Sequence, residues 1–167
     1  ECRRLEEGLS YSAERLMAVW PSRFRTLAEA APYARAPEAL ANHVYGSRNE
    51  LGNRGPGSGD GWRYRGGGPL QLTGRASYVA AASGTGHPLV EHPELLRTPG
   101  PEAADSAGWF WRCKGCNELA DACRLDASPE ALDAPFRLLT KRINGGLVGL
   151  EERLRYWQIA RDTMSSL

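Results

Sequence analysis

The chain has 167 residues, a formal net charge of +1, and apolar and charged contents of 41% and 25%. These values are close to those of globular proteins and suit one domain with a hydrophobic core. The balanced charge argues against a nucleic-acid partner, and no apolar run reaches the ~18 residues that a membrane-spanning helix needs.

The first part of the chain predicts short helices. In residues 12–20 the apolar side chains recur at helical spacing, Ser12 is a suitable N-cap, and Pro21 ends the pattern. A further helix is expected to begin at Pro37, where proline suits the first turn, and to reach Gly46.

The middle of the chain is rich in glycine. Residues 47–68 contain so much Gly, Asn and Asp that we expect an ordered loop without helix. The next segment, "PLQLTG" at 69–74, has the alternation of a short strand. A helix is expected from about Arg75 to Gly84, followed by a proline-broken connection over residues 87–99.

Three longer helices are expected in the last part, over residues 101–113, 128–144 and 150–167, the second with Ser128 as its N-cap. The apolar face of the last helix is expected to hold Leu150, Leu154, Trp157 and Ile159. The predicted fold is therefore mostly α, with one short strand-like segment and a glycine-rich loop that lines a cleft.

Cysteine spacing leaves two interpretations open. The set Cys113, Cys116 and Cys123 has the spacing of a zinc knuckle or redox pair, but no second ligand pair follows at matching spacing. The alternative, which we favour, is that these residues and Cys2 are ordinary thiols, and that the protein holds no metal or other cofactor. A disulfide remains open.

Several long segments resemble one enzyme family. The segment "SGDGWRYRGGGPLQLTGRASY" is similar to the signature of glycoside hydrolase family 19, the chitinase-like enzymes, and most similar to its phage endolysin branch. The segments "RRLEEGLSYSAERLMAVWPSRF", "AGWFWRCKGCNELAD" and "RINGGLVGLEERLRYW" match the same family in the same order. The resemblance covers residues 3–160 and implies a lysozyme-superfamily-like helical fold. We expect residues 1–167 to be a single catalytic domain that lacks its N-terminal part.

Glycoside hydrolysis normally uses two carboxyl groups, one as general acid and one as base or nucleophile. The resemblance implies an inverting reaction and places the general base at Glu7, with Glu6 as the neighbouring alternative. Without the resemblance, either would be an exposed loop carboxylate. The family's general acid lies in a "HES"-like motif, which falls just before Glu1, so we expect the acid ahead of this chain. The alternative is an unusual role for Glu1 itself.

The resemblance also assigns roles in the glycine-rich segment. It places Gln71 and Thr73 on the cleft floor, where the Thr73 hydroxyl helps to hold the attacking water and the Gln71 amide contacts sugar. The alternative is that both are outward residues of a short strand. Trp62 and Tyr64 can stack on sugar rings or be buried aromatics, and both readings stay open. The family has Arg at the position of Gly67, so one polar contact near the cleft is expected to be missing.

Two residues near the C-terminus complete the predicted site. Asn144 in "RINGG" matches a sugar-binding Asn of the family, with Gly145 expected to end the preceding helix. Arg153 matches an Arg that points at the catalytic carboxylates, and its alternative is an exposed helix face beside Glu151 and Glu152.

Taken with the resemblance, these residues predict a glycosidase that cuts β-1,4 bonds in the N-acetylated glycan of peptidoglycan. The alternatives are a chitinase and a non-catalytic glycan-binding relative. We expect the protein to be a monomer. Because no signal-peptide pattern is visible, we expect it to be made in the cytoplasm of a bacterial host. Its expected place of action is the cell wall in the periplasm.

Overall fold

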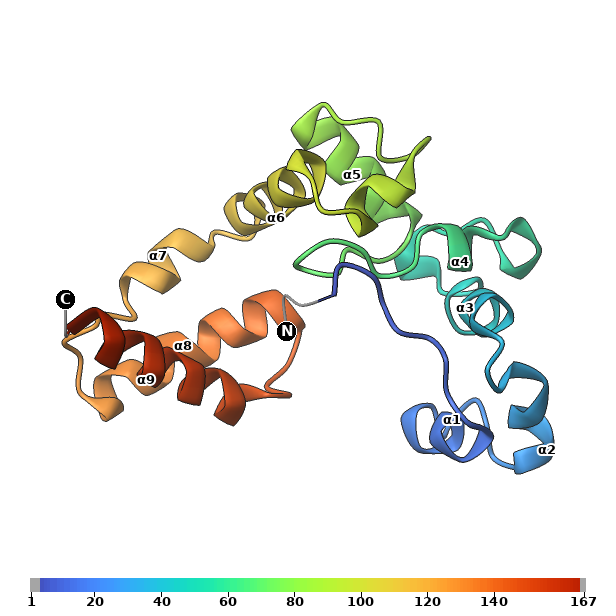
Figure 1. The fold of residues 1–167 in the computed structure, drawn as a ribbon, viewed down its shortest axis with the longest axis horizontal. Coiled ribbons are helices and arrows are strands. Elements are labelled where there is room, and N and C mark those ends of the chain that lie inside the picture. The colour runs from blue at the N-terminus through green and yellow to red at the C-terminus, as the bar shows by residue number, and fades with distance from the viewer. Residues whose placement is uncertain (1–3, 166–167) are drawn as a thin grey trace. The chain divides into compact units, whose positions relative to one another are not determined.

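The structure is a computed structural model, and it describes residues 4–165 except the side chains of Pro129 and Ser165. The fold is mostly α, as predicted (Figure 1). The α-helices of this part are α1 (Ala13–Val19), α2 (Leu27–Ala30), α3 (Pro37–Tyr45), α4 (Asp60–Arg63), α5 (Arg75–Thr85), α6 (Pro101–Cys113), α7 (Cys116–Asp121), α8 (Pro129–Asn144) and α9 (Leu150–Ser165). Short 3-10 turns are η1 (Ala31–Tyr33), η2 (Asn49–Leu51), η3 (Pro56–Ser58) and η4 (Pro93–Arg97).

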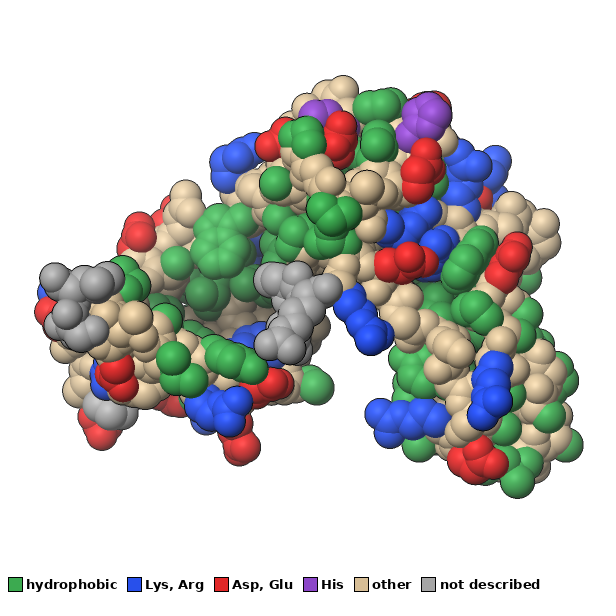
Figure 2. Space-filling view, in the orientation of Figure 1, with side chains coloured by type: hydrophobic (Ala, Val, Ile, Leu, Met, Phe, Trp, Pro, Cys, Tyr) green, Lys and Arg blue, Asp and Glu red, His purple; other side chains and the backbone are tan. Residues whose placement is uncertain are grey.

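The described chain divides into two compact units, with the boundary inside α6 between Trp109 and Phe110. We call them the N-terminal and the C-terminal unit. Acidic and basic side chains are interspersed on the visible face of each unit, with hydrophobic side chains between them (Figure 2). Within residues 4–165, no helix combines the length and the apolar character that crossing a bilayer requires.

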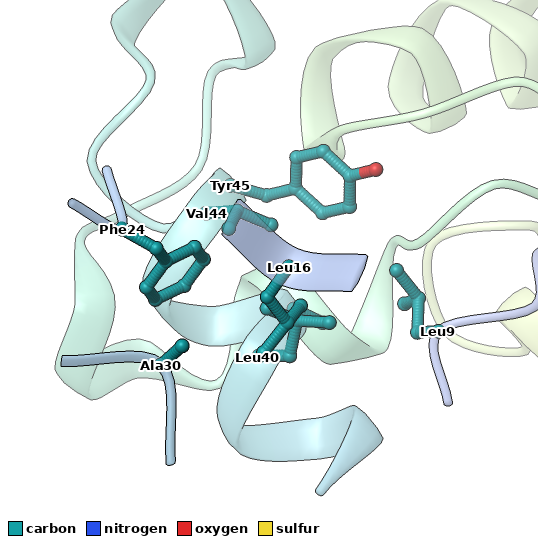
Figure 3. Packing of buried hydrophobic residues seen from close by; sticks show 8 residues of the cluster. Leu9, Leu16, Phe24, Ala30, Leu40, Val44 and Tyr45 are labelled. Carbon is teal, nitrogen blue, oxygen red and sulfur yellow. The ribbon is translucent and has the colours of Figure 1, made fainter. Parts of the chain in front are cut away.

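Helices α1 and α3 of the N-terminal unit begin where the sequence predicts. Ser12 caps α1 by accepting a hydrogen bond from the Arg15 backbone N–H, and Pro37 occupies the first turn of α3. These helices and the segment before them surround one hydrophobic cluster (Figure 3). Its buried members are Leu9, Leu16, Phe24, Ala30, Leu40, Ala41, Val44 and Tyr45.

The segment 47–68 is not free of helix as predicted, because it contains η2, η3 and the single turn α4. Tertiary contacts stabilise α4 despite the glycine within it. The Trp62 backbone N–H donates to Asn42 Oδ1 on α3 (2.9 Å). Gly61 lies so close to α3 that a Cβ there would be 2.5 Å from the Ala41 carbonyl oxygen. Glycine is needed here for close packing rather than for a loop conformation.

The strand predicted at 69–74 does not form. Among the described residues, extended pairing consists of isolated bridges, which join Gly67 to Glu6 and to Leu72. The residues between Gly67 and Leu72 turn the chain back on itself, and Gln71 has a left-handed φ of 52°. This backbone cannot continue a strand, so the alternation of "PLQLTG" misleads.

Helix α5 continues past its predicted end at Gly84. A Cβ at Gly84 would overlap the indole nitrogen of Trp109, so this glycine lets α6 pack against α5. The helix ends instead at Thr85, and the φ of 78° at Gly86 provides the left-handed cap.

The C-terminal unit contains α7, α8 and α9. Ser128 caps α8 as predicted, and Leu132, Phe136 and Leu150 form a second core between α8 and α9. Ile159, which was expected on the apolar face of α9, is 54% exposed. It lies nine positions after Leu150, and at 100° per residue this places it on the opposite side of the helix.

Candidate active site

The candidate site in the N-terminal unit is built where the extended segment 5–8 meets the glycine-rich turn. The Glu7 backbone N–H donates to the Gly66 carbonyl (3.0 Å), and the Gly68 N–H donates to the Leu5 carbonyl (2.9 Å). Because successive side chains of an extended chain point in opposite directions, this pairing sends Glu6 and Glu7 to different surroundings.

The Glu7 carboxylate is held at both oxygens. The Tyr45 hydroxyl donates to Oε1 (2.5 Å), and the Gly66 backbone N–H donates to Oε2 (3.1 Å). The residue is half-buried. Two donors fix the plane of the carboxylate, and its partial exposure keeps it in contact with solvent.

Glu6 has a different environment. Arg65 donates to Glu6 Oε1 through Nε (2.8 Å) and Nη2 (2.5 Å), and the Arg65 guanidinium stacks on the ring of Trp62, 3.6 Å from its centroid. Arg65 is buried, so Glu6 is its counter-ion. This pair joins the N-terminal segment to the glycine-rich turn and gives Glu6 a structural role.

Gly66 is required by the close approach of the two sides of the site. A Cβ at this position would lie 2.8 Å from Gln71 Oε1 and 3.1 Å from Glu7 Oε2. The side chains of Glu7 and Gln71 therefore lie beside the same glycine. The structure thus brings together these two residues, which are far apart in the sequence.

Gln71 and Thr73 are fixed by local hydrogen bonds. Gln71 is exposed, and its Nε2 donates to the Gly68 carbonyl (2.9 Å). Thr73 is half-buried, and its hydroxyl donates to the Gln71 carbonyl (3.1 Å), which leaves its lone pairs able to accept from water. The left-handed backbone of Gln71 is uncommon for a residue other than glycine, and such conformations cluster at functional sites.

The two aromatic residues have packing roles here. Tyr64 is 3% exposed, packs on Tyr78 (ring centroids 5.2 Å apart) and donates its hydroxyl to the Val90 carbonyl (3.2 Å). Such a buried ring does not fit the predicted stacking on sugar. Trp62 is half-buried, and Arg65 occupies one face of its ring.

Gly67 lies in the interior of the unit. A Cβ there would be 2.6 Å from the Tyr78 hydroxyl and 3.1 Å from Leu96 Cβ. The Tyr78 hydroxyl donates to the Arg65 carbonyl (2.8 Å). The Tyr78 hydroxyl therefore occupies the space that the Cβ of any other residue at position 67 would need.

In the C-terminal unit, Asn144 and Arg153 contact each other. Asn144 is the last residue of α8, and Gly145 ends the helix with a φ of 73°, as predicted. With its amide oxygen turned toward Arg153, Asn144 accepts from Nη1 (3.0 Å) and Nη2 (2.9 Å). Arg153 Nη1 also donates to the Val148 carbonyl (2.7 Å). That this pair and Glu7 face one cleft stays a prediction.

The thiols do not form a metal site in the described part of the chain, where no cluster of His, Cys, Asp or Glu has the geometry to hold an ion. Cys113 is exposed, Cys116 buried and Cys123 half-buried, all as free thiols. Burial raises the pKa of Cys116 and of Cys123. Cys2 and Glu1 lie outside the described residues.

Tyr45 was missed at the sequence level. It follows Val44 on the apolar face of α3, where the pattern predicts only core packing. The sequence did contain a signal for a polar role of this residue, because a buried tyrosine hydroxyl normally needs a hydrogen-bond partner. The partner itself cannot be read from the pattern.

Comparison with known proteins decides the family. The chain is 34% identical over 155 residues to a glycosyl hydrolase family 19 domain-containing protein of Haemophilus influenzae, covering 93% of this chain and 68% of that protein. The chain belongs to glycosyl hydrolase family 19. This family membership makes it a glycoside hydrolase of the chitinase-like type and agrees with its mostly helical fold.

Plant members of family 19 are also similar. The acidic 27 kDa endochitinase of Solanum lycopersicum is 33% identical over 92 residues, half of this chain and 37% of the plant protein. Acidic endochitinase Q of Nicotiana tabacum is 32% identical over 111 residues, 58% of this chain and 44% of the plant protein. The chain thus spans less than half the length of these two relatives. No protein-family model matches it.

Proposed function

We propose that this family 19 protein hydrolyses β-1,4 bonds in the N-acetylated glycan of bacterial peptidoglycan, with Glu7 as the general base. One observation carries the proposal: the Glu7 carboxylate is half-buried, held by Tyr45 and Gly66, and lies beside Gln71 on the glycine-rich turn. A carboxylate with this orientation suits the removal of a proton from water.

The proposed reaction inverts the anomeric centre. Glu7 accepts a proton from water as the water attacks, Thr73 accepts a hydrogen bond from the same water, and Gln71 contacts the sugar. A second carboxyl group protonates the leaving oxygen. The water between them needs a gap of roughly 6.5–9.5 Å between the two carboxyl groups.

Asn144 and Arg153 are proposed to bind sugar from the C-terminal unit. The Arg153 guanidinium holds the Asn144 amide oxygen, so the amide nitrogen points away from Arg153. An amide nitrogen in this position can donate to a sugar hydroxyl or N-acetyl oxygen. Arg153 supplies positive charge, which favours an ionised carboxylate near it.

Peptidoglycan is proposed because the sequence resembles the endolysin branch of the family. Chitin is the second candidate, favoured by the plant endochitinases among the similar proteins. We further propose that the protein acts as a monomer on the bacterial wall, after synthesis in the host cytoplasm. The test measures release of reducing ends from purified peptidoglycan and from a chitin oligomer, together with lysis of Gram-negative cells whose outer membrane has been permeabilised. Release from chitin alone overturns the peptidoglycan assignment.

Variants of the two adjacent glutamates test the mechanism. In the full-length protein, Glu7→Gln is expected to lower kcat by on the order of 10²-fold or more, the scale of a lost general base, with the fold and glycan affinity kept. Glu6→Gln is the matched control for kcat, because its glutamine oxygen can still accept from Arg65. Loss of the counter-ion of buried Arg65 should lower the stability of this variant, so thermal melts of both variants accompany the rates. If Glu6→Gln is inactive and Glu7→Gln is active, the general base is Glu6 rather than Glu7. If both variants bind glycan and the wild type does not cleave it, the protein is a binding relative.

A further inference from the structure

Tyr45 joins the hydrophobic cluster of the N-terminal unit to the candidate base. The residue is 8% exposed and lies at the C-terminal end of α3. Its ring packs at the edge of the cluster, and its hydroxyl oxygen points away from the aliphatic side chains (Figure 3). The phenol is therefore held by packing on one side and directed toward Glu7 on the other.

The backbone of Tyr45 is tied to the glycine-rich segment. Asn53 Nδ2 donates to the Tyr45 carbonyl (3.1 Å), and Asn53 Oδ1 accepts from the Arg75 backbone N–H at the start of α5 (2.9 Å). Asn53 thus links the end of α3 to the residue that follows the turn carrying Gln71 and Thr73. The Tyr45 hydroxyl and the turn are therefore held in fixed positions relative to each other.

We propose that Tyr45 is a positioning residue for Glu7, which fixes one carboxylate oxygen through its hydroxyl while the Gly66 N–H fixes the other. This inference rests on the proposed role of Glu7 as base. With both oxygens held, the carboxylate plane is set before substrate arrives, and the remaining lone pairs are aimed at water. Preorganised groups of this kind need no rearrangement during the reaction.

The tyrosine is suited to act as a donor at every working pH. Burial, and then the nearby Glu7 carboxylate, raise the pKa of the Tyr45 phenol, so it stays protonated. Tyr11 and Arg48 also face this phenol, and the Glu6–Arg65 pair lies one residue from Glu7. These groups are unchanged when only the hydroxyl is removed.

Tyr45→Phe tests the proposal in the full-length protein, by kcat and KM on the glycan that it cleaves. Without the hydroxyl, one oxygen of the Glu7 carboxylate loses its donor, so the base is less well oriented when the water attacks. We expect kcat to fall about tenfold with KM unchanged. Tyr33→Phe removes a hydroxyl from the same cluster and should keep the wild-type kcat and KM.

A second measurement does not depend on activity. Crystal structures of the wild type and of Tyr45→Phe are compared at the Glu7 carboxylate, with thermal melts to verify folding. A carboxylate that rotates or becomes disordered in the variant supports the proposal, and one that keeps its wild-type orientation overturns it. If Glu7→Gln is inactive while Tyr45→Phe keeps wild-type kcat and KM, the inference alone fails. If Glu7→Gln is fully active, the proposed base fails and the inference falls with it.

Discussion

Asp60 and Arg54 form the ion pair that closes the loop between α3 and α4. Arg54 donates to Asp60 through Nε (2.9 Å), Nη2 (2.9 Å) and its own backbone N–H (3.0 Å). The Asp60 side chain is fully buried, whereas that of Arg54 is 62% exposed. The carboxylate thus replaces its lost hydration with three donors from one residue.

Loss of this carboxylate should destabilise the N-terminal unit. Asp60→Asn puts an amide N–H₂ beside the donors of Arg54, so at least one hydrogen bond is lost in a buried place. We expect the free energy of unfolding to fall by on the order of 1–3 kcal/mol. Chemical denaturation measures it, with Asp126→Asn in an exposed pair as the control. Equal stability of both variants and wild type would contradict this view of the loop.

The same pair predicts a pH dependence of stability. Hydrogen bonds from Arg54 lower the pKa of Asp60 below its ordinary value. Because the folded pKa is the lower one, the contribution of Asp60 is complete above the unfolded pKa of about 4 and is lost as pH falls through the folded pKa. Denaturation between about pH 6 and pH 2 should show a smaller loss of stability for Asp60→Asn than for wild type.

Gly66→Ala should damage the site more than the fold. The added Cβ would press on Gln71 Oε1 and on Glu7, so we expect kcat to fall on the order of tenfold or more through misplacement of the base. Gly57→Ala is the matched control, since a Cβ there meets nothing within 4 Å. Hydrolysis rates and thermal melts of both variants make the comparison, and a fully active Gly66→Ala would contradict the close approach.

Gly84→Ala should weaken the packing of α5 against Trp109. The new methyl group would overlap the indole ring, and overpacking of this kind costs about 1–3 kcal/mol. Elsewhere in an exposed helix, Gly→Ala stabilises, so the sign of the change is the test. Ser83→Ala, at the exposed neighbouring position, is the control. A rise in Tm for Gly84→Ala would show that the ring moves aside at little cost.

The thiols should differ in reactivity. Cys113 is exposed, whereas Cys116 is buried and its thiol pKa is raised by that burial. Because the thiolate is the reactive form, alkylation of the native protein near neutral pH should label Cys113 well before Cys116. Mass spectrometry of the peptides follows the two rates. Equal labelling in the native state, and not only after denaturation, would contradict the burial of Cys116.

Local signals determined much of this protein. Ser12, Pro37, Ser128 and Gly145 predict helix ends correctly, because a cap depends on hydrogen bonds within a few residues. The segment around "RYRGGGPLQLTG" predicts the family in the same way, since its glycines and polar residues stand at fixed spacing along the chain.

The contacts between segments far apart in the sequence were decided only by the tertiary structure. The sequence does not distinguish Glu6 from Glu7. In the structure, Arg65 pairs with the Glu6 carboxylate, whereas the Tyr45 hydroxyl donates to the Glu7 carboxylate. The sequence predicts a helix end at Gly84, whereas the structure shows that this glycine makes room for Trp109. In each case the partner lies at least 25 positions away, and periodicity carries no information about it. The physical reason is that caps are satisfied locally, whereas a buried charge or a close helix contact depends on which surfaces meet.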